Sequence, residues 1–279
     1  MKIFLKYSFV ILLTLTSAIA LPFLLKHAGK TSPQGETTAE LQTVPAESDS
    51  AATAGTTEET DTTEETKAET AETESETAEA SASPVFTEVS ADYFDDALLI
   101  GDSRTVGLSE YGGLSNATYF ADVGMSSFNV LSKKLTVPGI GETDLPSLLA
   151  GRKFGKIYLM LGINEMGDGC DAVFEQYSAV AAQLRAAQPD AVLFVEANLR
   201  VTAEKSTSDA VFNNPNINCL NEKIASLADG QSVFYLDVNP LFDDGSGNLN
   251  VDLSGDGIHV YGVGYQEWGE WLLTMGIVK

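Results

Sequence analysis

The sequence has few cysteines, few histidines and few basic residues. Its 279 residues include two cysteines, two histidines and 16 lysines or arginines, against 40 aspartates or glutamates. Two cysteines exclude a scaffold with several disulfides and a zinc site with four cysteine ligands. Two histidines leave little room for a histidine-based metal site, so we expect none. The formal net charge of −24 disfavours nucleic acids as partners, because their phosphates would be repelled.

The charge is distributed unevenly along the chain. Residues 1–30 contain four lysines and no acidic residue, whereas residues 31–90 contain 15 acidic residues and one lysine. Residues 91–279 contain 25 acidic and 11 basic residues. Together with the apolar patterning, these changes predict three parts: an N-terminal segment (1–30), a linker (31–83) and a folded domain (84–279).

The N-terminal part carries the only long apolar run. The 19 residues from Tyr7 to Leu25 are uncharged, which is close to the roughly 20 residues that span a bilayer as a helix. Ala18–Ala20 resembles a small-x-small signal-peptidase site. Two interpretations remain open: a signal-anchor helix over about residues 7–25, or a signal peptide that is removed near Ala20. We expect an extracytoplasmic protein with a single-pass membrane anchor, and a secreted protein is the alternative.

The second part lacks the residues that build a core. Between positions 31 and 83 the only large apolar residues are Leu41 and Val44, and most others are Thr, Glu, Ala or Ser. Such a segment cannot bury enough apolar surface to offset its conformational entropy. We therefore expect a disordered acidic stalk over residues 31–83, with spacing as its role.

The third part alternates between strand and helix patterns. Short runs rich in apolar, β-branched or aromatic residues are typical of buried parallel strands, and five occur here: 97–100, 117–121, 156–161, 191–195 and 232–236. Apolar residues at helical spacing predict helices over 171–188, 215–229 and 264–275. This alternation predicts an α/β fold with three layers, an α/β/α sandwich around a parallel sheet.

Polar residues follow the expected strands at the sheet edge where ligands bind in such folds. Ser103 follows the first strand, Gly124 the second and Asn164 the third. His259 is the only histidine after residue 30, and Asp256 precedes it by three residues. An acid that orients an imidazole prepares it to take a proton from a hydroxyl. We therefore predict nucleophilic catalysis, with Ser103 as the nucleophile.

The same residues resemble the sequence blocks of the SGNH hydrolases, also called GDSL esterases or lipases. The family's Ser, Gly, Asn and His occur here in that chain order, and its Asp-x-x-His block is present. Two positions differ from the family pattern: Arg104 replaces Leu after Gly-Asp-Ser, and Glu165 replaces Asp after Gly-x-Asn. Neither change affects a reacting atom. The resemblance covers approximately residues 92–279.

The resemblance implies a flavodoxin-like five-stranded parallel sheet and a serine mechanism without a metal or cofactor. In that mechanism Ser103 attacks the ester, His259 takes its proton and Asp256 orients His259. The backbone amides of Ser103 and Gly124 and the side-chain amide of Asn164 would form the oxyanion hole.

Other polar residues are weaker candidates. Arg104 could contact an anionic substrate group, although a solvated or ion-paired residue is the favoured interpretation. Asn213 and Asn214 are possible substrate contacts, because they end a polar loop expected beside the site. The favoured expectation for Cys170 and Cys219 is that they do not pair, but the sequence does not decide this.

The resulting functional expectation is a bacterial, extracytoplasmic serine esterase. We expect it to remove a small acyl group, such as acetyl, from a carbohydrate or a cell-envelope ester. Three alternatives stay open: an O-acyltransferase to a sugar hydroxyl, which would need a separate membrane partner as acyl donor; a lysophospholipase-like lipid esterase; and a non-catalytic glycan-binding module. The catalytic residues do not separate these activities, because pocket walls select the substrate.

Overall fold

The computed structural model describes residues 85–278. The predicted membrane or signal segment and the predicted acidic stalk lie outside the described residues. No helix within 85–278 is long and apolar enough to cross a membrane.

The centre of the domain is a five-stranded sheet in the order β2-β1-β5-β6-β7. All four neighbouring pairs are parallel, which confirms the predicted flavodoxin-like sheet. The strand bounds are β1 Ala97–Gly101, β2 Thr118–Ala121, β5 Lys156–Met160, β6 Val192–Glu196 and β7 Val233–Leu236.

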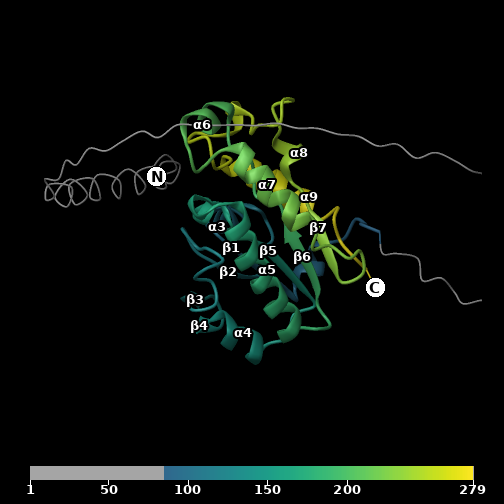
Figure 1. The fold of residues 1–279 in the computed structure, drawn as a ribbon. Coiled ribbons are helices and arrows are strands. Elements are labelled where there is room, and N and C mark those ends of the chain that lie inside the picture. The colour runs from purple at the N-terminus through teal and green to yellow at the C-terminus, as the bar shows by residue number, and fades with distance from the viewer. Residues whose placement is uncertain (1–84, 279) are drawn as a thin grey trace, which may run out of the picture. The chain divides into compact units, whose positions relative to one another are not determined.

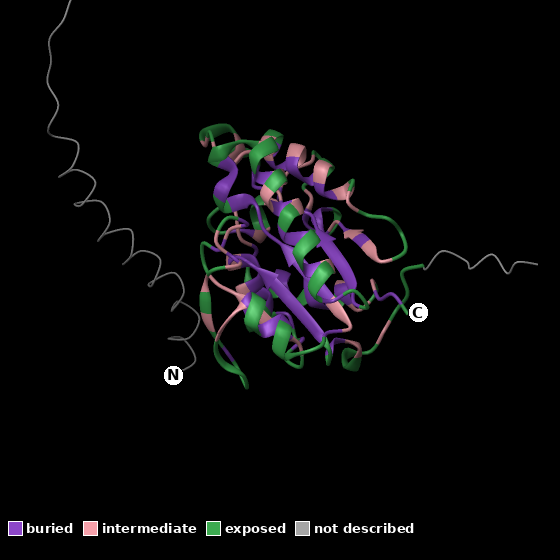
Figure 2. Cartoon of the chain, turned by 60° about the horizontal axis from the view of Figure 1, so that its bottom comes forward, coloured by how far each residue is buried: buried purple, intermediate pink, exposed green. Residues whose placement is uncertain are grey.

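Helices cover both faces of this sheet, so the three predicted layers are present (Figure 1). Alternate residues of each strand face opposite sides, and Leu98 and Leu99 accordingly belong to different core clusters. One cluster packs under α4, α5 and α7, and the other packs under α3 and α9. The helix bounds are α3 Ser103–Tyr111, α4 Leu145–Gly151, α5 Cys170–Ala187, α7 Asn214–Ala225 and α9 Gly262–Leu272. Figure 2 shows the buried strands between helices whose outer faces are exposed.

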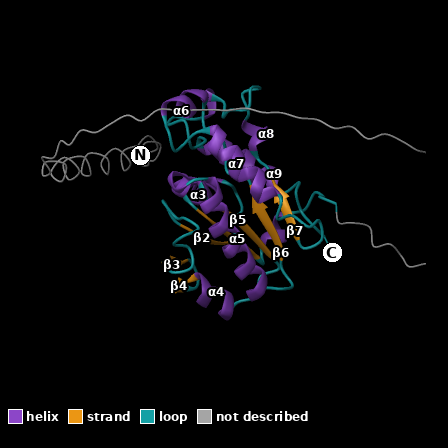
Figure 3. Ribbon diagram, viewed as in Figure 1, coloured by secondary structure: helices purple, strands orange, loops and turns teal. Residues whose placement is uncertain are grey.

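Shorter elements complete the domain, and several of them were not predicted. The strands β3 and β4 form an antiparallel pair beside α4 (Figure 3). The segment between β6 and α7, expected as a loop, contains the short helix α6. The remaining bounds are η1 Ala91–Phe94, β3 Lys134–Val137, β4 Gly141–Asp144, η2 Ile163–Asp168, α6 Ala203–Ser208, α8 Asn239–Phe242 and η3 Val251–Leu253.

Close contact between α3 and α9 depends on glycine. A Cβ at Gly269 would lie 1.8 Å from the carbonyl oxygen of Gly112, and a Cβ at Gly107 would lie 2.3 Å from the ring of Tyr265. The two helices therefore approach closely, and Trp268 of α9 is completely buried in the core beneath them. This burial gives Trp268 a packing role.

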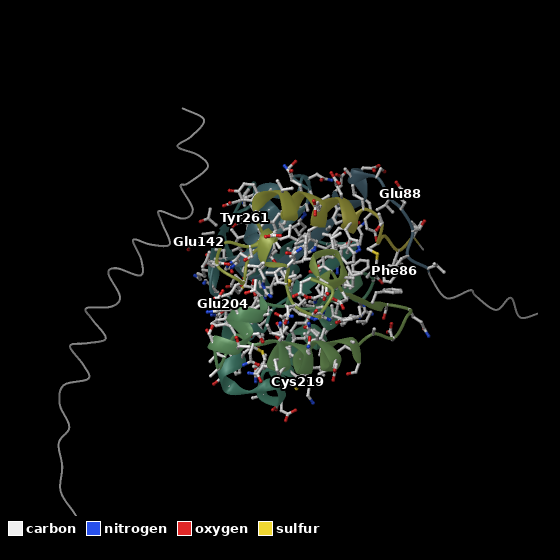
Figure 4. The ribbon with its side chains drawn as sticks, turned by 90° about the horizontal axis from the view of Figure 1, so that it is seen from above. Phe86, Glu88, Glu142, Glu204, Cys219 and Tyr261 are labelled. Carbon is white, nitrogen blue, oxygen red and sulfur yellow. A yellow bond between two sulfur atoms is a disulfide. The ribbon has the colours of Figure 1, made fainter. Side chains whose placement is uncertain are left out.

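A disulfide joins two helices on the other face. Cys170 begins α5 and Cys219 lies in α7, and the two sulfurs are bonded with a Cα–Cα distance of 6.2 Å. Figure 4 labels Cys219. The expectation that these cysteines do not pair is therefore wrong. They are 49 positions apart in the sequence, so only the packing of α5 against α7 brings them together.

Candidate active site

The turn after β1 places Ser103 at the first position of α3. The side chain of Asp102 caps the helix by accepting a hydrogen bond from the backbone N–H of Arg104 at 3.0 Å. Because Ser103 is the first residue of the helix, its own N–H has no acceptor inside the helix. The turn is tight, since a Cβ at Gly101 would lie 2.0 Å from the hydroxyl oxygen of Thr105.

Ser103, His259 and Asp256 form one continuous hydrogen-bonded series. The Oγ of Ser103 lies 2.8 Å from Nε2 of His259, and Nδ1 of His259 lies 2.7 Å from Oδ2 of Asp256. The His259 side chain is 21% exposed, so it is shielded but still reachable from solvent. The structure thus brings Ser103 to the Asp256–His259 pair, although Ser103 and His259 lie 156 positions apart in the sequence.

The loop that holds the histidine is fixed at several points. Oδ1 of Asp256 accepts hydrogen bonds from the backbone N–H groups of Ile258 and His259. The carbonyl of Gly257 accepts a hydrogen bond of 2.9 Å from the backbone N–H of Thr202, which precedes α6. Figure 4 labels Tyr261, two residues after His259, and Glu204 of α6.

The environment of Asp256 favours its ionised form. Partial burial alone would raise the pKa of Asp256. The hydrogen bonds from the side chain and backbone of His259, together with the charge of that imidazole, outweigh the burial and lower the pKa below its usual value. An ionised Asp256 can hold the Nδ1 proton of His259, which leaves Nε2 free to accept the proton of Ser103.

The two other predicted oxyanion donors, Gly124 and Asn164, lie in turns that follow β2 and β5. Gly124 follows β2 with a φ of 74°, and a Cβ built there would meet nothing within 4 Å. Asn164 is exposed in η2, which follows β5, and its Nδ2 donates to the carbonyl of Met125 at 2.9 Å. This bond holds Asn164 beside the residue that follows Gly124. Both strands are neighbours of β1, so all three turns leave the sheet at the same edge.

Glu165 forms hydrogen bonds with the segment that follows Gly124. Its buried carboxylate accepts hydrogen bonds from the backbone N–H and the hydroxyl of Ser127 at 2.6 and 2.7 Å. Burial raises the pKa of Glu165, and the two bonds from Ser127 oppose this change. The sequence reveals only that Glu165 replaces an Asp, so this positioning contact was missed.

Each of the three possible substrate contacts makes hydrogen bonds within the domain. Arg104 is fully buried and ion-paired with Asp102, which agrees with the favoured interpretation of an ion-paired residue and leaves no exposed surface that could meet a substrate. Asn213 caps α7 by accepting from the N–H of Asn216. Asn214 is buried and bonds both the N–H and the carbonyl of Val201.

Comparison with known proteins gives the family. The family described as GDSL-like Lipase/Acylhydrolase matches residues 99–267, which contain every residue of the series described above. The chain belongs to this family. No curated protein matches the sequence of this acylhydrolase. The family assigns ester hydrolysis to the chain, and its substrate is therefore an ester.

The chain is also similar to solved structures at low sequence identity. A GDSL-like lipase from Bacteroides thetaiotaomicron is 15% identical with a TM-score of 0.49, and the match covers 69% of the acylhydrolase and 90% of the lipase. A carbohydrate acetylesterase family member from Sinorhizobium meliloti is 16% identical with a TM-score of 0.45, covering 64% and 95% of the two chains.

Proposed function

We propose that the protein is a serine esterase in which Ser103, His259 and Asp256 carry out the chemistry. The observation that supports this most directly is the unbroken series of short hydrogen bonds from Ser103 to Asp256. Oγ of Ser103 attacks the ester carbonyl while Nε2 of His259 takes its proton. His259 then gives this proton to the departing alcohol, and water attacks the acyl-enzyme with His259 as base again.

The developing negative charge needs hydrogen-bond donors that are already in place. Three donors are suited to this role: the backbone N–H groups of Ser103 and Gly124, and Nδ2 of Asn164. The turns that carry them follow neighbouring parallel strands, so they lie at the same edge of the sheet. The Asn164 amide carries two N–H bonds, and its contact with Met125 uses one of them. The other remains for the oxyanion.

We assign a small acyl group on a carbohydrate or cell-envelope ester as the substrate. The N-terminal apolar run and the acidic segment after it support export and a membrane tether, which would hold the enzyme at the envelope. The Cys170–Cys219 disulfide agrees with an oxidising compartment.

Release of acetate from acetylated oligosaccharides tests this proposal. The full chain in detergent is incubated with the sugar ester or with a lysophospholipid, and Ser103→Ala is assayed in parallel. We expect acetate release that Ser103→Ala abolishes, with little fatty-acid release. Faster release of fatty acid would instead assign a lipid esterase. Acetate that moves to an added acceptor sugar instead of water would assign the same site to acyl transfer.

A further inference from the structure

Arg104, the residue that follows the nucleophile, is completely buried. Its side chain has no exposed surface, and neither has that of Asp102. The Nε of Arg104 donates to Oδ1 of Asp102 at 2.9 Å, and Nη2 donates to Oδ2 at 2.5 Å. Removing two charges from water is costly, so this pair requires an explanation beyond the helix cap that Asp102 alone provides.

The guanidinium also reaches a second segment of the chain. Nη2 of Arg104 donates to Oδ1 of Asn198 at 2.8 Å, and Asn198 follows β6. Nδ2 of Asn198 donates to the carbonyl of Leu161 at 2.9 Å. Leu161 lies three residues before Asn164, the proposed oxyanion donor. A continuous hydrogen-bonded route therefore joins the turn of Ser103 to the turn of Asn164.

Hydrogen bonds between other side chains and the backbone of Asn198 fix its position. Its N–H donates to the side-chain oxygen of Asn221 at 2.7 Å. Its carbonyl accepts from the side-chain amides of Asn221 at 2.8 Å and Asn239 at 3.1 Å. Side chains of α7 and α8 thus hold Asn198 in place.

The geometry points to Arg104 and Asn198 as positioning residues that set the oxyanion donor Asn164 relative to the nucleophile Ser103. Arg104 has the planar fork that binds both oxygens of Asp102 and still reaches Asn198. Lysine has one nitrogen and no planar fork, so it cannot bind both oxygens of Asp102 in this bidentate way and also reach Asn198. This inference rests on the proposed roles of Ser103 and Asn164 and adds what sets their spacing.

A double-mutant cycle in the full-length protein tests this role. Arg104→Lys and Asn198→Ala are each made alone and together with Asn164→Ala, and kcat and KM are measured with a short-chain nitrophenyl ester. We expect each single change to lower kcat by about 10-fold or more and to change KM by less than about 3-fold. In the Asn164→Ala background the same change should lower kcat by less than about 3-fold, because the donor it positions is gone.

A matched control is available on the same protein. Arg185 of α5 donates to the carbonyl of Ala191 at 2.6 Å, near the opposite end of the sheet. Arg185→Lys should leave kcat unchanged. If Arg104→Lys does not fold, judged by circular dichroism, Asn198→Ala carries the comparison, because it leaves the pair with Asp102 intact.

Two results would overturn the inference. An equal loss of kcat with and without Asn164 would mean that Arg104 and Asn198 act on stability or elsewhere in the site. A change confined to KM, with kcat unaltered, would also contradict the inference, because a displaced oxyanion donor should lower kcat. Normal kcat in Asn164→Ala alone is a separate result, because it would contradict the proposed oxyanion hole before the cycle is built.

Discussion

The proposed mechanism assigns one atom of Asn164, the side-chain nitrogen Nδ2, to stabilisation of the oxyanion. Asn164→Ala should lower kcat by about 10²–10³-fold, the loss seen when another serine enzyme loses an oxyanion donor. KM and the unfolding temperature should change little, because Asn164 is exposed. Steady-state kinetics with a nitrophenyl ester measures this loss.

The control for this change is Asn116→Ala. Asn116 is also exposed, and it precedes β2 at the opposite edge of the sheet, where its side chain bonds Ala91 and Asp95. It should keep full activity. A kcat for Asn164→Ala within about 3-fold of the parent would contradict the oxyanion role.

Glu196 should make stability depend on pH. Burial raises its pKa to about 8, although the charge of Arg104 opposes this rise. Between its ordinary pKa of 4.5 and about 8, the folded protein holds a proton that the unfolded chain has released. The free energy of unfolding therefore falls as pH rises through this window, by at most about 1.4 kcal/mol per pH unit.

Glu196→Gln removes the titrating group and should flatten this slope. Urea unfolding at several pH values between 5 and 8 compares the parent with the variant. The difference between them isolates Glu196, because the other groups titrate equally in both proteins. Identical slopes in the two proteins would show that Glu196 does not hold its proton in the folded state.

At the residue scale, the sequence predicted the residues that motifs mark and missed buried contacts between segments that no motif marks. The pairing of Asp256 with His259 was predictable, because the two residues lie three positions apart and the domain has no other histidine. The burial of Arg104 was not predictable. Its partner Asn198 lies 94 positions away, and a charged residue at a helix start is equally compatible with solvent.

Between elements, the disulfide of α5 and α7 should contribute to stability. A loop of 49 residues predicts a loss of about 4 kcal/mol by the chain-entropy estimate, and about 2–4 kcal/mol is typical. Urea unfolding of the Cys170→Ser/Cys219→Ser variant measures this loss. The parent in a reductant that opens the bond should behave in the same way. An unchanged unfolding midpoint in both would contradict a stabilising role.

The main elements were predictable because their patterns are strong. The five strands are short, apolar and bounded by turns, and the predicted ranges differ from the observed ones by at most one residue at either end. The pair β3–β4 was missed because β4 contains no apolar residue and the polar–apolar alternation of β3 covers only four residues. The helix α6 was missed because it has no buried residue and therefore no apolar face.

The proposal that concerns the whole molecule is that the protein is located at the cell envelope. In the cells that produce it, the protein should be found with the membrane fraction and be digested by a protease added to intact cells. A cytoplasmic protein produced in the same cells should resist the protease. Recovery in the medium would favour the cleaved signal peptide. Protection from the protease, together with recovery in the cytoplasmic fraction, would contradict export.

The identity of the nucleophile is the claim on which the rest depends. A fluorophosphonate probe reacts with activated serines, and mass spectrometry locates the residue that it modifies. We predict one adduct, on Ser103, with labelling lost in Ser103→Ala and strongly slowed in His259→Ala because the proton acceptor is missing. Folded protein that hydrolyses esters but carries the adduct on another serine, or that stays active as Ser103→Ala, would contradict the account.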